Sequence, residues 1–389
     1  MGHGPLVGSP PHRRGGDTAL HHPADVDGLT VMAQDPETVK WTTVPQRYGP
    51  AEAEGWLRLV EGAWRKQTMW SWSIELADGD RPRFAGNLDI RLGPPPDVGF
   101  ALAPWARGRG VMVRAARLAL RWAFDEGELP VVHWSAGAGN LASWRVAHAV
   151  GFTFDGSRPR SIPHRGELRD GWFAHLGPED VMTPRTRWRL PVELVGERVR
   201  LRPHRNADLP RIAEACSDAR TRHWLPTMPA PYTEEHARSF VLGCRLEESL
   251  GISITWAAAD RESGRLLANV GLLHLASDRS PGSGEIGYWA HPDARGWGVV
   301  REAVDLVVVH ALAPEGEDGL GLRRLQIGAA WATLPVVVRP REPASSRSVT
   351  SGSTAASAMA PTRTAPGTTA SIRQGDALPG RLLRERHGE

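Results

Sequence analysis

The sequence predicts a mixed α/β fold that is built twice along the chain. Two observations carry this prediction. Each half places several apolar, strand-like runs together and then alternates helix-like and strand-like segments, a pattern typical of a mixed sheet with helices packed on it. The second half repeats the order and spacing of the first, and the repeat of roughly 150 residues has the size of one ordinary domain.

The duplication is clearest around a glycine-rich turn. The first copy reads DVGFALAPWARGRGVMVRAARLAL over 97–120, and the second reads EIGYWAHPDARGWGVVREAVDLVV over 285–308. Upstream, Asp25 and Asp35 have the same separation as Asp208 and Asp218. The expected divisions are a disordered tail (1–17), a complete first domain (18–182), a Pro/Arg-rich linker (183–192), an incomplete second domain (193–333) and a second disordered tail (334–389).

Each copy is expected to contain the same elements in the same order. In the first copy these are a strand near 18–22, a helix after Asp25, strands at 71–76, 84–92 and 97–103, a helix after Gly110, a strand at 130–136, a short helix from Leu141 to Gly151 and a strand at 171–176. The second copy supplies a strand at 198–202, a helix after Asp208 and strands at 252–259, 266–275 and 285–290. Aspartate favours a helix start and glycine a helix end, which sets these boundaries.

Composition describes a globular protein and argues against a general nucleic-acid binder. The chain has 47 Lys and Arg against 44 Asp and Glu, a formal charge of only +3. Lysine occurs only at Lys40 and Lys66, so the arginine bias is first a matter of codon usage. Two cysteines make no disulfide framework, and no apolar run is long enough to cross a bilayer. We expect a cytoplasmic protein that binds neither nucleic acid nor membrane.

The turn is the strongest candidate binding feature. It reads ARGRG over 106–110 and ARGWG over 294–298, in each case between a strand and a helix. Glycines let the backbone approach a ligand closely, and the unpaired N–H groups of a helix start attract anions. Because Val113 stands where a third glycine would be, the dinucleotide fingerprint is incomplete. A pyrophosphate therefore fits the turn, with Arg107 and Arg109 at its rim, whereas Arg114, Arg117 and Arg121 read as a solvated helix face.

Both copies resemble the GNAT superfamily of acetyl-CoA-dependent N-acetyltransferases, in its branch of ribosomal-protein alanine acetyltransferases (RimJ/RimL type). The family's Gln/Arg-x-x-Gly-x-Gly/Ala motif is matched from Arg107 to Met112 and from Arg295 to Val300, except at the last residue. The first copy also has the branch's opening, and its Asn-x-x-Ser … Gly-Phe element is present as Asn140, Ser143, Gly151 and Phe152. The residues of the opening are Asp35, Pro36, Glu37, Trp41, Pro45 and Tyr48.

The resemblance implies tandem acyltransferase domains and direct acetyl transfer from acetyl-CoA to a primary amine, without a metal. It implies that the turn at 107–112 anchors the pyrophosphate. The cofactor is then bound by Arg107, Gly108, Arg109, Gly110, Val111 and Asn140 in the first copy, and by Arg295, Gly296 and Gly298 in the second. Backbone N–H groups of 99–103 would stabilise the oxyanion. Asp97, with Glu285 as its counterpart, is the candidate base, and Ser143 is the candidate hydroxyl for the leaving thiolate.

Each of these assignments has a structural alternative. Asp97 can be a solvated residue at a strand start, Ser143 a helix-turn hydrogen bond, and Asn140 a helix cap. The whole chain can instead be a non-catalytic protein of the same fold that binds acyl-CoA or acts as a scaffold. The acceptor stays open between a protein N-terminus, a small amine and an antibiotic, and the two copies can pack on each other.

The second copy loses the pattern after Trp331. The Asn-x-x-Ser and Gly-Phe residues that should follow are missing, and a segment rich in Ser, Thr, Ala, Pro and Arg takes their place. If the frame is read from the third base of the Trp331 codon, the codons permit Gly-Asn with a correctly spaced Ser. Those over 343–345 then permit Gly-Phe, as far from that Asn as Gly151 is from Asn140. We therefore predict a frameshift near 331; the nucleotide sequence tests it, and bases that do not spell these residues would refute it.

Overall fold

The protein is described by a computed structural model covering residues 20–78, 81–225, 227–277, 280–329 and 368–373. The chain divides into two compact units, Met1–Arg185 and Thr186–Glu389. The predicted tail 1–17 and the frameshift hypothesis both lie outside the described residues. Within those residues, no helix is long and apolar enough to cross a membrane.

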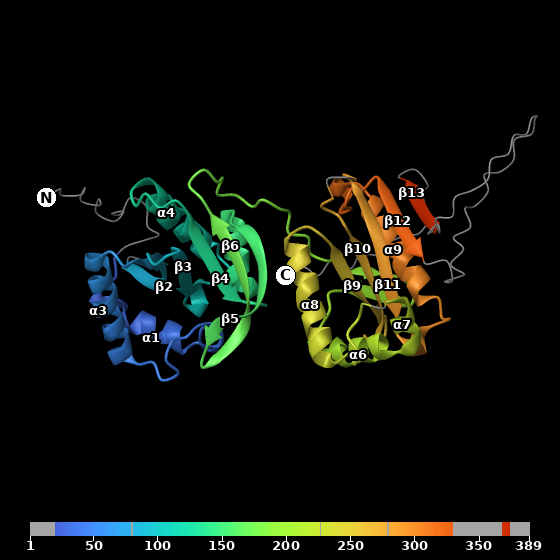
Figure 1. Cartoon of the computed structure of the whole chain (residues 1–389), viewed down its shortest axis with the longest axis horizontal. Coiled ribbons are helices and arrows are strands. Elements are labelled where there is room, and N and C mark those ends of the chain that lie inside the picture. The colour runs from blue at the N-terminus through green and yellow to red at the C-terminus, as the bar shows by residue number, and fades with distance from the viewer. Residues whose placement is uncertain (1–19, 79–80, 226, 278–279, 330–367, 374–389) are drawn as a thin grey trace, which may run out of the picture. The chain divides into compact units, whose positions relative to one another are not determined.

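The first unit is a six-stranded mixed sheet with helices on it, in the strand order β1-β2-β3-β4-β6-β5. Figure 1 shows β2 and β3 between helices α1 and α4. Its helices are α1 (Val26–Gln34), α2 (Pro36–Trp41), α3 (Pro50–Lys66), α4 (Val111–Asp125) and α5 (Leu141–Val150). Its strands are β1 (Met69–Asp78), β2 (Arg81–Arg91), β3 (Asp97–Leu102), β4 (Val132–Gly137), β5 (Thr153–His164) and β6 (Glu167–Leu176).

The middle of this sheet opens between β3 and β4. These two strands are parallel, and their register covers only the pairs Asp97–His133 and Val98–Trp134. Beyond Val98, β3 stays paired with β2 as far as Leu102, while β4 stays paired with β6. The edge of β3 from 99 to 102 therefore faces β4 without pairing with it, which leaves backbone groups available to a ligand.

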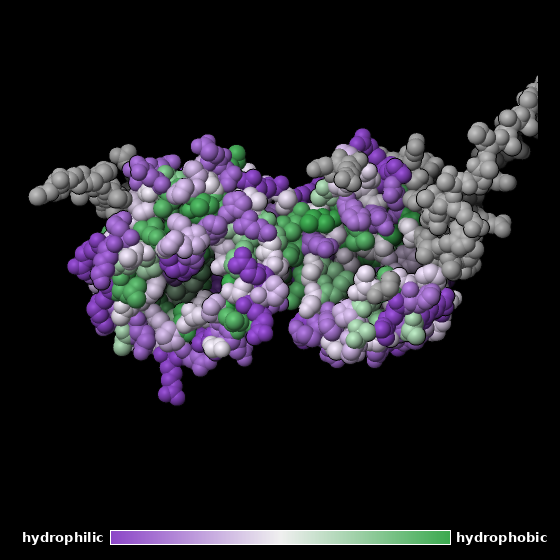
Figure 2. Space-filling model, in the orientation of Figure 1, coloured by the Kyte–Doolittle hydropathy of each residue, from purple (hydrophilic) through white to green (hydrophobic). Residues whose placement is uncertain are grey.

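The second unit repeats these elements up to its last strands. It contains α6 (Leu209–Ser217), α7 (Ala219–Trp224), α8 (Glu234–Ser249) and α9 (Val299–Leu312). Its strands are β7 (Leu194–Val195), β8 (Val199–Arg202), β9 (Ile254–Asp260), β10 (Leu266–Leu273), β11 (Ser283–Ala290), β12 (Arg324–Ala329) and β13 (Thr368–Arg373). The predicted mixed α/β class and the duplication are both confirmed. Polar residues cover most of the face of each unit that Figure 2 shows.

Several expected elements differ from the structure. Residues 20–22 are not a strand, and the remainder of the strand expected at 18–22 lies outside the described residues. Helices α3 and α8 and strand β5 are not among the elements expected from the sequence. In the region expected to be a disordered tail, the six described residues form β13 against β12, so the expectation is wrong for them.

Candidate active site

Two glycines bend the chain into the turn that precedes α4. Gly108 and Gly110 have φ angles of +75° and +69°, in the left-handed region that favours glycine. Building a Cβ on Gly108 meets no atom within 4 Å, so open space lies above this part of the turn. The first N–H that bonds back along the helix is that of Arg114, to the Gly110 carbonyl, and no side chain caps this end. The N–H groups of 111–113 are therefore the ones a bound anion would meet.

Arg107 is partly exposed beside the turn, and its guanidinium is paired with groups of the protein itself. Its guanidinium donates to the Asp35 carboxylate at 2.6 Å, to the Thr38 hydroxyl at 3.0 Å and to the Leu102 carbonyl at 3.1 Å. Asp35 also caps α2, since its carboxylate accepts the Thr38 N–H at 3.0 Å. Arg107 therefore works as a strut that ties the start of α2 to the end of β3. Of the two arginines in the turn of the first unit, Arg109 is the exposed one and can contact a phosphate.

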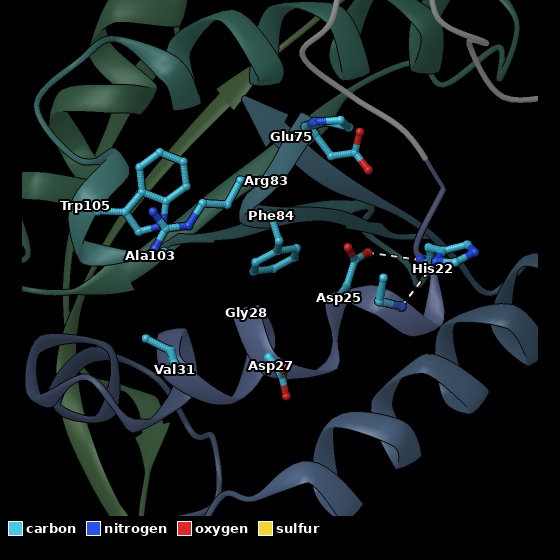
Figure 3. A pocket seen from close by; sticks show the side chains of 12 residues that line it. His22, Asp25, Asp27, Gly28, Val31, Glu75, Arg83, Phe84, Ala103 and Trp105 are labelled. Carbon is cyan, nitrogen blue, oxygen red and sulfur yellow. Dashed lines mark hydrogen bonds between the residues drawn. The ribbon is translucent and has the colours of Figure 1, made fainter. Parts of the chain in front are cut away.

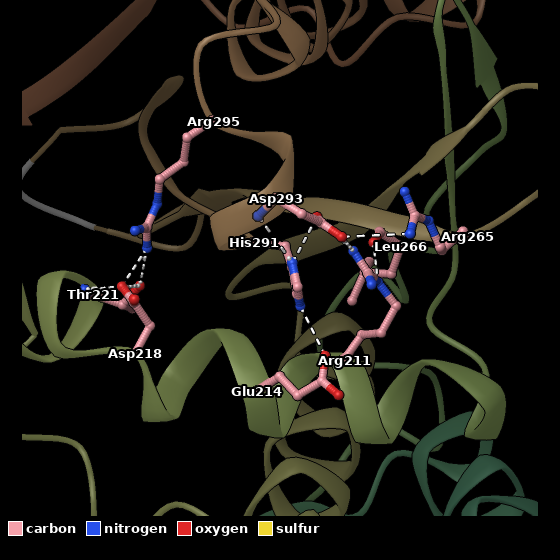
Figure 4. Close-up of polar contacts among 9 residues, drawn as sticks. All are labelled: Arg211, Glu214, Asp218, Thr221, Arg265, Leu266, His291, Asp293 and Arg295. Atoms are coloured by element: carbon pink, nitrogen blue, oxygen red, sulfur yellow. Dashed lines mark hydrogen bonds and ion pairs between the residues drawn. The ribbon is translucent and has the colours of Figure 1, made fainter.

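The same strut occurs in the second unit. There the Arg295 guanidinium pairs with Asp218 and donates to the Thr221 hydroxyl at 2.8 Å (Figure 4). Asp218 caps α7 as Asp35 caps α2. Gly296 and Gly298 have φ angles of +82° and +76°, so the backbone of the turn is also repeated.

The ion pair sets the charge of both aspartates. Burial alone would raise the pKa of Asp35, but hydrogen bonds from Arg107 and Thr38 and the Arg107 charge outweigh it, and the pKa lies below its ordinary value. For Asp218 the hydrogen bond from Arg295 is the largest influence and also lowers the pKa. Both carboxylates are thus ionised at neutral pH, as a strut to a guanidinium requires.

The arginines of α4 are not simply a solvated face. Arg114 donates to the Arg109 carbonyl at 3.2 Å, which holds the turn's outward carbonyl, and Arg117 donates to the Ala149 carbonyl at 2.8 Å near the end of α5. Arg114 is exposed, as predicted, whereas Arg117 is partly buried, so the prediction of a solvated position is wrong for Arg117. In the second unit, Arg198 performs the Arg114 function by donating to the Trp297 carbonyl at 2.8 Å.

Asn140 and Ser143 lie together at the start of α5. The Asn140 amide oxygen accepts the Ser143 N–H at 3.2 Å, so Asn140 is the helix cap that the sequence offered as one alternative. The Ser143 hydroxyl accepts from the Trp134 indole at 3.1 Å, and its own proton is directed elsewhere. Since Trp134 belongs to β4, this hydroxyl lies against the strand that parts from β3.

Asp97 is held by Arg91 rather than standing at a solvated strand start. Arg91 pairs with both carboxylate oxygens of Asp97, one of them at 2.9 Å, and also reaches Asp89 at 3.1 Å. A Cβ on Gly99 would lie 2.8 Å from the Arg91 guanidinium and 3.1 Å from the Asp89 carboxylate, so this glycine makes room for both. The cluster therefore lies over the strand whose far edge opens toward β4.

Asp89 is the titratable residue that the sequence reasoning missed. Its side chain is buried, and burial raises its pKa to about 6; Arg91 lowers the pKa and the nearby Asp97 raises it. A carboxyl that titrates near neutrality is suited to general-base chemistry. The sequence signal for Asp89 is the alternation of Asn87, Asp89 and Arg91, which places three polar side chains on one face of β2.

The sequence profile of the acetyltransferase (GNAT) domain matches the chain twice, at residues 19–153 and 198–346. The chain belongs to the GNAT acetyltransferase family. It is an acetyl-CoA-dependent acyltransferase built from two GNAT domains in tandem, as the sequence motifs implied.

Solved structures of other acetyltransferases are similar to part of the chain. RimJ of Mycobacterium smegmatis in complex with CoA-disulfide is 20% identical over 42% of this chain and 81% of that one, with a TM-score of 0.38. The microcin C7 self-immunity acetyltransferase MccE, in complex with acetyl-CoA and AMP, is 13% identical over 41% and 91%, with a TM-score of 0.38. The ribosomal-protein-S5-alanine acetyltransferase of Vibrio fischeri is 18% identical over 42% and 93%, with a TM-score of 0.36.

The two GNAT domains differ at the candidate base and hydroxyl. In the second domain Gly271 and Leu273 occupy the places of Asp89 and Arg91, and Glu285 pairs with His274 at 3.3 Å. The counterparts of Asn140 and Ser143 are missing from the sequence. The second domain thus keeps the glycine turn, its strut and an acidic residue in the place of Asp97, but its sequence has no counterpart of Asp89, Asn140 or Ser143.

We predict that Asp35→Ala loosens the turn of the first GNAT domain. It removes a helix cap and the partner of Arg107, so hydrogen exchange at 107–113 should speed up by about fivefold or more, given a cap worth about 1 kcal/mol. Asp35→Asn, which keeps a capping oxygen but not the charge, should have a smaller effect. In the parent, the strut should hold above about pH 4 and fail only as pH falls through the lowered pKa of Asp35.

Asp218→Ala is the matched control for this experiment. It should speed exchange at 295–301 and leave 107–113 unchanged. Unaltered exchange at 107–113 in the Asp35→Ala protein would show that the turn does not depend on the strut.

We predict that Asp89→Asn stabilises the protein at alkaline pH only. With its pKa raised to about 6, Asp89 holds its proton more tightly in the native state than in the unfolded chain. Its ionisation therefore costs stability above about pH 6 and nothing below about pH 4. Asp89→Asn cannot ionise and should add roughly 2 kcal/mol at pH 8, with little change at pH 4.

Calorimetric unfolding of the full chain at the two pH values measures the difference. Glu61→Gln, at an exposed position on α3, serves as the control and should show no such dependence. An equal gain at both pH values for Asp89→Asn would mean that its burial does not penalise the charge.

Proposed function

We propose that the first GNAT domain transfers the acetyl group of acetyl-CoA directly to a primary amine. One observation carries this proposal: an uncapped helix start behind two left-handed glycines, with open space above Gly108, beside a strand edge that has separated from its neighbour. The N–H groups of 111–113 and the exposed Arg109 would bind the pyrophosphate. The edge of β3 from 99 to 102 would align the pantetheine chain and place N–H groups at the thioester carbonyl.

Acetyl transfer to an amine requires two proton transfers. As the amine nitrogen attacks the thioester carbon, a carbon–nitrogen bond forms and the carbon–sulfur bond breaks, while nitrogen loses a proton and sulfur gains one. The Ser143 hydroxyl, whose oxygen already accepts from Trp134, would donate its proton toward the departing sulfur. No oxidant or reductant is involved.

We assign the proton acceptor to the Asp89–Arg91–Asp97 cluster rather than to Asp97 alone. Because Arg91 pairs with both oxygens of Asp97, abstraction by Asp97 would have to break that pair. Asp89 lies beside Gly99, where only backbone separates it from the open edge of β3. A water molecule between the edge and Asp89 would complete the path for the proton.

We infer the class of the acceptor amine from the branch of the family that the sequence resembles. The RimJ/RimL resemblance favours the α-amino group of a protein, and a small amine or an antibiotic is the alternative. Because the second domain lacks the cluster and the hydroxyl, we expect it to act as a binding module. The packing of the two domains on each other stays a prediction.

Thiol release from acetyl-CoA, with a panel of peptides and small amines, tests the proposal on the full chain. Ser143→Ala should lower kcat by about a hundredfold with little change in KM, whereas Ser135→Ala, at an exposed position on β4, should leave both unchanged. Gly110→Ala should raise KM for acetyl-CoA, because it strains a left-handed backbone, and the paired Gly298→Ala should not. Tight binding of acetyl-CoA without thiol release in the presence of any amine would contradict the proposal.

A further inference from the structure

A pocket of about 550 Å³ opens in the first domain between α1 and the strands β1 and β2 (Figure 3). It is lined by Gly28 and Val31 on α1, by Phe84 on β2, and by Ala103 and Trp105 at the end of β3. This volume is within the range of small-molecule sites. The pocket does not include the glycine turn, so it is distinct from the place assigned to acetyl-CoA.

The second domain fills the corresponding place with charged side chains. Counting from the paired aspartates and turns, Gly28, Val31, Ala103 and Trp105 correspond to Arg211, Glu214, His291 and Asp293. There the Arg211 guanidinium donates to the Leu266 carbonyl at 2.6 Å and to Asp293 at 2.8 Å, and His291 bridges Asp293 and Glu214 at 2.7 and 3.0 Å (Figure 4). The first domain has replaced this network with small and apolar residues, and an open pocket results.

Within the described residues, the buried carboxylate in the lining of the pocket has no arginine partner like that of its counterpart in the second domain. In the second domain the buried Asp208 is held by two hydrogen bonds from Arg202, at 2.7 and 2.8 Å. Its counterpart Asp25 is 4% exposed and lines the pocket, and the sequence places Ala19 where Arg202 would be. Among the described residues Asp25 accepts only the His22 N–H, at 3.0 Å, and the nearest imidazole nitrogen, on His21, is 3.8 Å away.

Burial makes that imidazole a poor counter-ion. It lowers the pKa of His21 to about 4, so the ring is neutral at physiological pH. The neighbouring His22 directs its Nδ1 to the Ala24 N–H, from which it accepts at 3.1 Å. The remaining charged side chains of the lining are Asp27, Glu75 and Arg83, and the Arg83 guanidinium lies over the Trp105 ring, 4.4 Å from its centroid. Of the carboxylates in the lining, Asp25 is buried and Asp27 is exposed.

We propose that this pocket binds a small molecule bearing a guanidinium group, which takes the place on Asp25 that Arg202 takes on Asp208. A planar fork of N–H donors matches a carboxylate, and desolvation inside the pocket strengthens the pair. The aliphatic part of the ligand lies against Val31 and Phe84. This site goes beyond acetyl transfer and does not require that the first domain be catalytic.

Calorimetric titration of the full chain with butylguanidinium tests the proposal, with butylurea as its neutral isostere. Butylguanidinium should bind saturably and at least about tenfold more tightly than butylurea, because a charge-assisted pair is lost in the urea. Saturating acetyl-CoA should not displace it. Equal binding of the two compounds, displacement by acetyl-CoA, or no saturable binding would each overturn the proposal, as would equally tight binding of butylammonium.

Two substitutions of opposite charge at one exposed position test where the ligand binds, and neither disturbs the core. Val31 is 59% exposed at the pocket rim. Val31→Glu, which introduces the residue type of Glu214, should tighten butylguanidinium binding, and Val31→Arg should weaken it, each by about two- to fivefold. The same substitutions at Leu59, a 54% exposed position on α3, are the controls and should change nothing. Equal effects at Val31 and Leu59 would place the binding elsewhere, and acetyl transfer measured on the same proteins reports separately on the proposed function.

Discussion

The ion pair between Arg107 and Asp35 is the constraint on which the active site of the first domain depends. A turn with two left-handed glycines is entropically costly, and a helix start with no capping side chain is weak by itself. The strut compensates for both, because one guanidinium binds the cap of α2, the Thr38 hydroxyl and the last carbonyl of β3. The N–H groups of the turn can therefore stay unpaired, and preorganised, for an anion.

The repetition of this strut separates what the fold needs from what the chemistry needs. Arg295, Asp218 and Thr221 reproduce it in a domain whose sequence has no counterpart of Asp89 or Ser143. A feature that recurs without those residues belongs to the architecture of the turn. Asp89, Arg91 and Ser143 occur only in the first domain, and they are the residues for which a chemical function is the natural explanation.

The sequence predicted the strands, the main helix, the glycine turn and the duplication well, because these follow from periodicity and from glycines that recur at fixed spacing. It did not predict the partner of Arg107, since a motif specifies which residue is present but not whether its charge is already paired with another side chain. Asp35, which receives that charge, is far away in the sequence. Asp89 was missed for a related reason: its raised pKa comes from burial beneath neighbours on other strands, and composition does not reveal burial.

The two domains show how one scaffold handles the same buried carboxylate in two ways. Asp208 is neutralised within the chain by Arg202, and the space beside it is closed by Arg211, His291 and Asp293. Asp25 keeps its place at the start of α1, where it receives the His22 N–H, but it lacks a guanidinium among the described residues. A buried carboxylate without a cation is costly unless something supplies one. An external cation would enter the open volume beside Asp25. The absence from this volume of the four charged or polar side chains that fill it in the second domain is therefore consistent with the proposed binding site.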